Sequence, residues 1–204
     1  MNFELIKKII FEFRPDLLIN FAAESHVDNS IKNPNDFIYS NIYGTFSLLE
    51  AFRLYVGKKK TKPRFFQIST DEVFGDIINQ KRKSLEIDSY VPSSPYSSSK
   101  ASADLLVKSW NRTYQLPFLI THTCNNFGPF QNKEKLIPKV IESCRNKISI
   151  PVYAKGKQIR EWIYVKDNVE AIKKLIFKKS TINQVFNIGS NFSCRNIDLI
   201  NLIC

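Results

Sequence analysis

A hydroxyl residue and two adjacent acids, Thr70-Asp71-Glu72, directly follow an apolar run that predicts a strand over 64–69. Two carboxyl groups in different surroundings can have separated pKa values, so that one is a protonated general acid and the other an ionised general base. An elimination of water needs both kinds of group. Threonine and aspartate also cap helices and form turns, so a structural role is the alternative interpretation.

A tyrosine and a lysine, Tyr96 and Lys100, stand four positions apart at the start of a predicted helix, which places both side chains on one helix face. A lysine ammonium close to a phenol stabilises the phenolate and lowers its pKa towards neutrality. The pair could then remove a proton from a hydroxyl group. Chance surface pairs with this spacing are common, but the serine- and alanine-rich surroundings and the preceding acid loop favour the catalytic interpretation.

These residues lie on a predicted alternation of helices and strands. Apolar residues recur at helical spacing over 3–13, 35–55, 96–114 and 135–146, and short apolar runs predict strands over 17–23, 64–69 and 118–124. This alternation predicts an α/β fold with a parallel sheet covered by helices on both faces. Ligands of such sheets bind beyond the carboxyl ends of the strands, where polar loops follow at 22–28, 69–75 and 125–129.

After residue 148 the pattern changes to shorter segments. Apolar runs at 150–153, 162–165 and 185–188 alternate with predicted helices over 167–178 and 196–203. We therefore expect residues 1–148 to form the larger, catalytic part and residues 149–204 to form a smaller α/β region packed on the sheet.

Glycine is scarce, with 6 in 204 residues and no two closer than 13 positions, against an average usage of about 7%. The phosphate-binding patterns G-x-G-x-x-G and G-x-x-x-x-G-K-[ST] need glycines within six positions, so this chain contains neither. The chain alone therefore lacks the usual glycine-rich cradle for a nucleotide.

The net charge of +11 would suit a polyanion, a membrane surface or a phosphorylated small ligand. The basic residues form scattered clusters, which favours a solvated surface over nucleic-acid binding. The four cysteines, spaced 20, 50 and 10 positions apart, indicate neither a metal site nor a disulfide scaffold. Since no apolar run has the length of a membrane span and no signal peptide is recognisable, we expect a cytoplasmic protein without membrane contact.

The motifs, taken in order, resemble a known group of enzymes. The chain is similar to the nucleotide-sugar branch of the extended short-chain dehydrogenases, and most similar to the dTDP-glucose 4,6-dehydratases. The resemblance covers nearly the whole chain, and the Thr-Asp-Glu triplet is its most discriminating part. The matching strings are FAAESHVDNSI, SNIYGT, QISTDEVFGD, PYSSSKASADLLV, NNFGPFQNKEKLIPKVI, PVYAKGKQIREWIYVKD and FNIGSN.

This resemblance implies a Rossmann-like sheet, NAD as cofactor and conversion of dTDP-glucose to its 4-keto-6-deoxy form. It implies that Tyr96, activated by Lys100, takes the 4-hydroxyl proton while hydride leaves C4, and that Thr70 holds that hydroxyl. Glu72 would take the C5 proton and Asp71 would protonate the departing 6-hydroxyl, before hydride returns to C6.

The resemblance also implies two sets of binding residues. The implied NAD contacts are Phe21, Ala22, Ala23, Glu24, Ser25, Ser40, Tyr96, Lys100 and Asn126. The implied substrate contacts are Ser25, Thr70, Asn125, Lys135, Leu136, Pro151, Val152, Tyr153, Arg160 and Asn196. Within the second set, Lys135 and Arg160 would meet the diphosphate as charge-assisted donors.

Three further residues are assigned structural roles. His26 and His122 are interpreted as hydrogen-bonded structural histidines, and Cys124 as a small buried thiol. His122 stands where this family usually has arginine, and Phe74 and Phe127 stand where it has tyrosine.

The family's glycine-rich turn for the NAD pyrophosphate precedes the region that this chain resembles, so we expect the chain to be truncated at both ends. The full-length family implies a homodimer. Two alternatives stay open: a related nucleotide-sugar dehydratase or epimerase, and a truncated, inactive chain that acts only as a binding or assembly partner.

Overall fold

The computed structural model describes residues 2–57, 59, 63–76, 83–150 and 152–204, with Tyr153 and Ala154 described by their backbone only. The chain forms two compact units, each built from several segments. Unit 1 comprises Met1–Gly75, Ser84–His122 and Lys178–Asn187, and unit 2 comprises Asp76–Lys83, Thr123–Phe177 and Ile188–Cys204. The predicted functional division at residue 148 stays a prediction.

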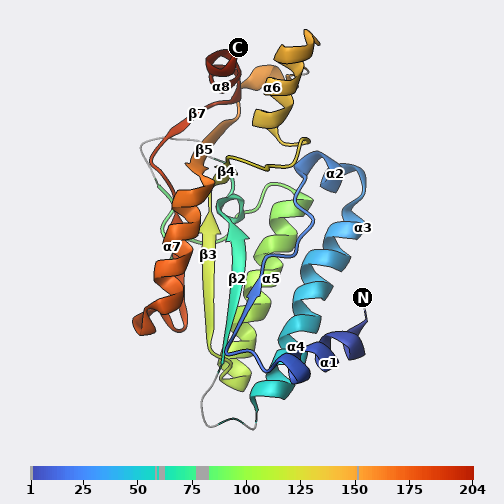
Figure 1. The fold of residues 1–204 in the computed structure, drawn as a ribbon, viewed down its shortest axis with the longest axis vertical. Helices are drawn as coiled ribbons and strands as arrows, with labels where there is room; N and C mark the ends of the chain where they lie inside the picture. Colours follow the sequence, from blue (N-terminus) through green and yellow to red (C-terminus); the bar gives the residue numbers. More distant parts are fainter. Residues whose placement is uncertain (1, 58, 60–62, 77–82, 151) are drawn as a thin grey trace. The chain divides into compact units, whose positions relative to one another are not determined.

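Unit 1 is built around a four-stranded sheet with the order β1-β2-β3-β6. β1 and β2 are parallel, with Leu17 opposite Arg64 and Asn20 opposite Gln67. The arrows of β1, β2 and β3 point the same way in Figure 1. The predicted α/β fold with a parallel sheet is confirmed. The strands are β1 (Leu17–Asn20), β2 (Arg64–Thr70), β3 (Phe118–Thr123) and β6 (Gln184–Ile188).

Two strand predictions need correction. The segment 185–188 was expected in the smaller region, but β6 is an edge strand of the main sheet beside β3. The Asn183 amide holds the start of this strand there, since its N–H donates to Phe118 O (2.8 Å) and its side chain accepts from Phe118 N (3.2 Å). β1 ends at Asn20 instead of residue 23, where its pairing with β2 ends, and the chain beyond it is held by bonds from the Asn41 side chain to the backbone of Glu24.

The helices of unit 1 follow the predicted apolar spacing closely. They are α1 (Phe3–Phe13), α2 (Val27–Lys32), α3 (Pro34–Phe37), α4 (Gly44–Val56) and α5 (Pro95–Tyr114). α2 was not predicted. The predicted helix over 35–55 is interrupted by a wider π-helical turn at Ile38–Tyr43 between α3 and α4.

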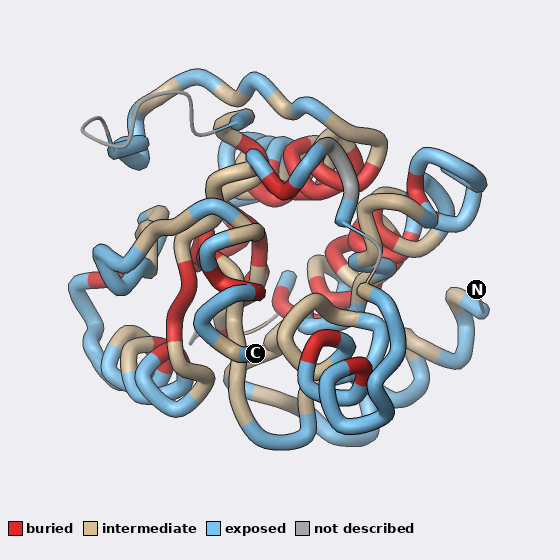
Figure 2. Tube along the Cα trace, turned by 90° about the horizontal axis from the view of Figure 1, so that it is seen from above, coloured by how far each residue is buried: buried red, intermediate tan, exposed pale blue. Residues whose placement is uncertain are grey.

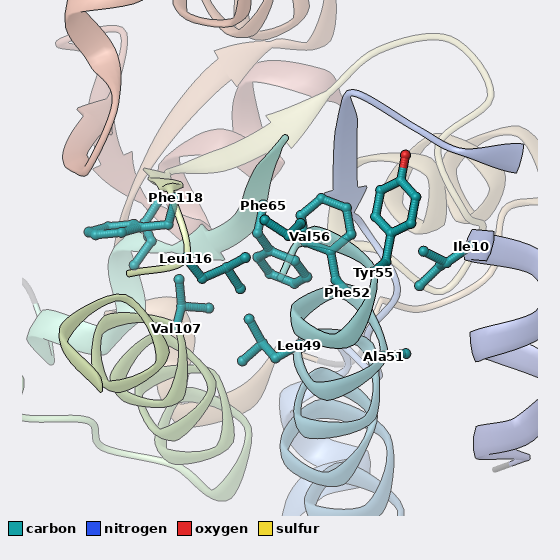
Figure 3. Packing of buried hydrophobic residues seen from close by; sticks show 11 residues of the cluster. Ile10, Leu49, Ala51, Phe52, Tyr55, Val56, Phe65, Val107, Leu116 and Phe118 are labelled. Atoms are coloured by element: carbon teal, nitrogen blue, oxygen red, sulfur yellow. The ribbon is translucent and has the colours of Figure 1, made fainter. Parts of the chain in front are cut away.

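The core of unit 1 lies where α1, α4 and α5 meet the strands (Figure 3). Phe52 of α4 and Phe65 of β2 are both fully buried, with ring centroids 6.1 Å apart. Each such side chain contributes about 1.5–3 kcal/mol when removed from water. In Figure 2 buried and exposed stretches alternate along the helices, as expected for helices with one face on a core.

Unit 2 contains a three-stranded sheet with the order β4-β5-β7. β4 (Asn125–Phe127) and β5 (Ile159–Tyr164) are parallel, and β7 (Ser193–Arg195) is antiparallel to β5. Its helices are α6 (Leu136–Asn146), α7 (Val165–Phe177) and α8 (Asn196–Ile203), near the predicted ranges. Among the described residues of both units, no helix is long and apolar enough to cross a membrane.

Candidate active site

The predicted acid loop is a short 3-10 turn at the carboxyl end of β2. Thr70 ends the strand, and its Oγ1 accepts a hydrogen bond from the N–H of Glu72 (3.2 Å), which caps the turn Asp71–Phe74. The Thr70 hydroxyl also lies 3.3 Å from Asp71 Oδ1. The threonine therefore has a structural function in this turn in addition to its predicted contact with substrate.

Gly75 closes the same turn in a conformation reserved for glycine. Its φ of 90° and ψ of −164° lie in a region that residues with a Cβ rarely adopt. A Cβ at this position would stand 2.6 Å from the carbonyl oxygen of Val91. The backbone N–H of Val91 in turn donates to Val73 O (2.9 Å), so the segment around residue 91 holds the acid loop in place.

The start of α5 is fixed by its own sequence. Ser94 and Ser97 form a reciprocal capping box, in which each side chain accepts from the other residue's backbone N–H (3.1 and 3.0 Å), and Pro95 occupies the first turn. Tyr96 and Lys100 follow on the buried face of the helix. Lys100 Nζ donates to Ile68 O of β2 (2.7 Å).

The structure brings Tyr96 together with the acid loop. Tyr96 is 9% exposed, and a hydrogen bond links its hydroxyl to Thr70. Burial raises the pKa of Tyr96, the charge of Glu72 raises it further, and the hydrogen bond from Thr70 opposes both, with smaller raising contributions from Asp71 and Asp104. The four predicted groups Thr70, Asp71, Glu72 and Tyr96 therefore share one electrostatic environment.

The pKa of Tyr96 is shifted in the opposite direction from the one that Lys100 led us to expect. The sequence predicted a lowered tyrosine pKa, but the pKa of Tyr96 is raised, because burial and nearby carboxylates dominate. Burial also lowers the pKa of Lys100, against an opposing contribution from Asp104. Without further positive charge in the site, Tyr96 holds its proton.

A cluster of buried and half-buried polar residues lies one helical turn beyond Lys100. Asp104 is fully buried, and its Oδ2 accepts hydrogen bonds from Ser69 Oγ (2.6 Å) and lies 3.1 Å from His122 Nε2. Tyr90 Oη lies 3.0 Å from His122 Nε2 and accepts from Lys108 Nζ (3.0 Å). We call these five residues, Ser69, Tyr90, Asp104, Lys108 and His122, the Asp104 cluster.

The Asp104 cluster is not a hydrolytic triad, although it contains a serine, a histidine and an aspartate. In such a triad the serine hydroxyl bonds to the histidine ring. Here Ser69 Oγ bonds to the carboxyl of Asp104, and His122 Nδ1 lies 3.1 Å from Asn187 Oδ1. The cluster instead connects β2, α5 and β3.

The structural histidine assignments have different outcomes. His122 is buried and hydrogen-bonded as predicted. His26 is half-buried, and its Nδ1 has no hydrogen-bond partner among the described residues, so its assignment as a hydrogen-bonded histidine stays a prediction. Cys124 is buried, as predicted.

The loop after β1, which carries most of the predicted NAD contacts, is anchored by Asn41. Asn41 is 2% exposed in the π-helical turn, accepts from Glu24 N (2.8 Å), and donates to Glu24 O (3.0 Å) and Ser99 Oγ (2.8 Å). This one amide holds the loop against α5 beside Tyr96. The other loop residues, Phe21, Ala22, Ala23 and Ser25, are exposed or half-buried.

A hollow of about 720 Å³ lies next to this loop and includes two predicted NAD contacts, Glu24 and Ser40. The remaining lining residues come from α3 and the π-helical turn: Asn35, Asp36, Ile38, Tyr39 and Tyr43. A hollow beside a loop at the carboxyl end of a parallel strand is where open α/β sheets bind ligands. This position agrees with the predicted binding role of the loop.

Most of the predicted substrate contacts lie in unit 2. Arg160 of β5 pairs with Cys194 of β7, and Asn196 begins α8 two residues later, with its N–H on Gln158 O (2.9 Å). The turn Tyr153–Gly156 packs on the start of α8, where a Cβ on Gly156 would stand 2.8 Å from Ile197 Cβ. Val152, Tyr153, Arg160 and Asn196 thus belong to neighbouring elements.

The other predicted binding residues of unit 2 lie on β4 and at the start of α6. Lys135 and Leu136 lie at the start of α6, and Asn125 lies in β4. The Asn126 side chain donates to Cys124 O (3.1 Å) and accepts from Asn168 (2.8 Å), so its amide already has partners within unit 2. Pro151 and the Tyr153 side chain fall outside the described residues.

Comparison with known proteins places the chain in a family. A family model described as GDP-mannose 4,6 dehydratase matches residues 1–203. The chain belongs to this family. Within the family, the resemblance to the dTDP-glucose 4,6-dehydratases is confirmed by the relatives that follow.

Curated relatives of this chain are named dTDP-glucose 4,6-dehydratase. One from Xanthomonas campestris pv. campestris (strain B100) is 43% identical over 204 residues, covering 98% of this chain and 58% of the relative. One from Haemophilus influenzae is 42% identical over 207 residues, covering 100% of this chain and 61% of the relative. The chain thus spans about three fifths of the length of these relatives.

Solved structures agree with the dehydratase fold. The dTDP-glucose 4,6-dehydratase DesIV of Streptomyces venezuelae, crystallised with NAD, superposes with a TM-score of 0.90 at 33% identity, over 99% of this chain and 60% of that one. A UDP-glucose 4-epimerase of Thermotoga maritima, crystallised with UDP-glucose, superposes with a TM-score of 0.83 at 26% identity, over 99% and 64%. The Rossmann-like fold class is confirmed.

Sequence analysis missed Asn41, Ser69 and Asp104. Asp104 had a usable signal, because Tyr96, Lys100 and Asp104 are spaced four apart and so lie in one stripe on α5. The sequence signal for Ser69 was weaker and consisted only of its position directly before the acid triplet. Asn41 had none, because its contacts depend on the π-helical turn.

Gly75→Ala tests the conformation of the acid loop. The new Cβ meets the Val91 carbonyl in a backbone conformation unsuited to alanine, so we expect the free energy of unfolding to fall by about 2–3 kcal/mol. Urea denaturation measures this change. Gly57→Ala is the matched control, since Gly57 has a φ of −56° and its nearest contact is at 3.4 Å. Equal stability of the two variants would contradict the account of the loop.

Asp104→Ala tests the buried cluster. Removal of this carboxyl leaves the Ser69 hydroxyl and the His122 ring without their buried partner, which should lower the free energy of unfolding by about 2–4 kcal/mol. Asp198→Ala is the control, because Asp198 pairs with Arg195 on the surface, where solvent screens ion pairs and leaves them little net effect on stability. A loss at Asp104 no larger than at Asp198 would show that the cluster does not hold β2 and α5 together.

Proposed function

We propose that this chain is the catalytic portion of an NAD-dependent dTDP-glucose 4,6-dehydratase, a hydro-lyase. The supporting observation is the buried position of Tyr96 against the acid loop, where its phenol interacts with Thr70 and with the charges of Glu72 and Asp71. Tyr96 can take the proton of a sugar hydroxyl during an oxidation, and the two carboxyl groups can serve as acid and base in the elimination of water that follows. The curated relatives at 42–43% identity carry the same name.

The residues around the loop after β1 fit an NAD cofactor. The small side chains of Ala22 and Ala23 leave the backbone accessible, and the hollow beside Glu24 and Ser40 gives room for a ligand. Phe21, 63% exposed, is an apolar ring that a bound ligand could cover. When bound, NAD would supply a positively charged nicotinamide ring able to take hydride from the sugar and, once reduced, to give it back.

Tyr96 starts the proposed reaction by accepting the proton of the sugar 4-hydroxyl. Its raised pKa must fall before it can do so near neutral pH, and a positive charge placed against the carboxylates would lower it. Lys100, held by Ile68 O next to the acid loop, contributes a cation from the same helix face. The phenol is therefore reactive only in the loaded site.

The two carboxyl residues then carry the elimination. Oxidation at C4 makes the C5 proton acidic, and Glu72 removes it as general base. Asp71 donates a proton to the 6-hydroxyl, which departs as water. The Thr70 cap fixes both side chains on one short turn, so their positions relative to Tyr96 are set before substrate binds.

The diphosphate and sugar contacts proposed for unit 2 use its cations and amides. Arg160, 24% exposed, lies 3.9 Å from Asp76 and has donors for a phosphate, and Lys135 begins α6. Asn125, Asn196, Val152 and Leu136 complete the proposed set together with Ser25, Pro151 and Tyr153. We further propose that the whole protein is cytoplasmic and forms a homodimer.

A chimera tests this function directly. In it, this chain replaces the matching segment of the Haemophilus influenzae relative, and the relative itself is the control. With NAD+ and dTDP-glucose we expect the 4-keto-6-deoxy sugar, detected by its absorbance in alkali. GDP-mannose and UDP-glucose, offered in parallel, distinguish the sibling activities. A chimera that gains thermal stability from NAD but forms no product from any of these sugars would refute the proposal.

Glu72→Gln in the same chimera separates chemistry from folding. Loss of the general base should lower kcat at least about 100-fold, while KM for dTDP-glucose changes little. Glu12→Gln, on the exposed surface of α1, is the matched control and should leave both constants unchanged. A Glu72→Gln variant with full kcat would remove Glu72 from the mechanism.

A further inference from the structure

Two cysteines far apart in the sequence meet in unit 2. Cys144 lies in the last turn of α6, and Cys204 directly follows α8, with its N–H on Ile200 O (3.1 Å). α6 and α8 pack against each other, and the two Sγ atoms lie 2.8 Å apart. Both residues are exposed. Sixty residues separate them, so the sequence spacing gave no sign of this pair.

The distance between the two Sγ atoms is only slightly longer than the S–S bond of a disulfide. A disulfide needs an S–S separation of about 2.05 Å, so the sulfur atoms must approach by less than about 1 Å. Neither helix has to move as a body for a change of that size. The exposure of both thiols also leaves them open to a small oxidant.

We propose that Cys144 and Cys204 form a reversible redox disulfide that ties the end of α6 to the end of α8. The oxidant class is a low-molecular-weight disulfide such as oxidised glutathione. The bond is a modification site distinct from the residues proposed for dehydration, and its formation does not depend on that activity.

The reaction is a thiol–disulfide exchange in two steps. The Cys144 thiolate attacks one sulfur of oxidised glutathione, which breaks its S–S bond, forms a mixed disulfide at Cys144 and releases one glutathione. The Cys204 thiolate then attacks Cys144 Sγ, which forms the intrachain bond and releases the second glutathione. The two protein thiols lose two electrons and two protons, and the glutathione disulfide is reduced to two thiols.

The hydrogen bond between the two thiols favours this order of attack. The hydrogen bond to Cys144 raises the pKa of Cys204, with burial and the negative charge of Cys144 as further causes. A thiol with a raised pKa is a poor first nucleophile, so we assign the first attack to Cys144 and the second to Cys204.

The disulfide would also act on the proposed sugar site, a consequence that rests on the proposed function. The helices it joins begin at Leu136 and Asn196, both proposed substrate contacts. Fixing the far ends of α6 and α8 restricts the movement of their first turns. Oxidation would then change KM for the nucleotide sugar and leave kcat nearly unchanged.

The test uses this chain as it stands. It is incubated with oxidised glutathione, its remaining thiols are blocked, and it is digested with trypsin under non-reducing conditions. We expect a linked pair of peptides, 140–145 and 196–204, which separates on addition of dithiothreitol. Because the bond closes a long loop, the oxidised chain should unfold about 5–10 °C higher than the reduced one.

Serine variants identify the pair. Cys144→Ser and Cys204→Ser should each abolish the linked peptides and the rise in Tm, whereas Cys194→Ser, at a half-buried cysteine in β7, should keep both. Linkage of Cys144 to Cys194, stable glutathione adducts without linkage, or dimers joined between chains would each overturn the proposal. Linked peptides in a chain whose chimera has no dehydratase activity would support the disulfide while refuting the proposed function.

Discussion

The hydrogen bond from Ser69 to Asp104 joins the two elements on which the proposed chemistry depends. Ser69 immediately precedes the acid triplet at the end of β2, and Asp104 lies on the stripe of α5 that also carries Tyr96 and Lys100. Lys100 contacts Ile68, the residue before Ser69, so successive residues of the strand meet successive turns of the helix. Ser69, Lys100 and Asp104 are all buried, so small relative movements of β2 and α5 would leave these polar groups without hydrogen-bond partners.

The same compact arrangement explains why Tyr96 is held in its protonated form. Burial and the carboxylates of the acid loop raise its pKa, and Lys100 is itself penalised by burial. A site with this balance favours the charged phenolate only when further positive charge enters it. In the proposed mechanism the reactivity of Tyr96 therefore depends on cofactor binding.

Much of this arrangement follows from local sequence. The alternation of apolar runs predicted the parallel sheet, and the four-residue spacing predicted Tyr96 and Lys100 on one helix face. The π-helical turn at Asn41 and the pairing of β6 with β3 were not predictable, because both depend on contacts between residues far apart in the chain. The pKa of Tyr96 was predicted in the wrong direction for the same reason: a sequence pattern shows the nearby lysine but not the depth of burial or the carboxylates across the site.

The central claim is that Tyr96 serves the oxidation while Asp71 and Glu72 serve the elimination. Rapid mixing of the chimera with NAD+ and dTDP-glucose tests it, with the absorbance of reduced nicotinamide as the signal. The account predicts that an Asp71→Asn, Glu72→Gln double variant accumulates reduced nicotinamide and releases little product, and that Tyr96→Phe accumulates almost none. Full product from the double variant, or equal accumulation of reduced nicotinamide in Tyr96→Phe, would contradict the assignment.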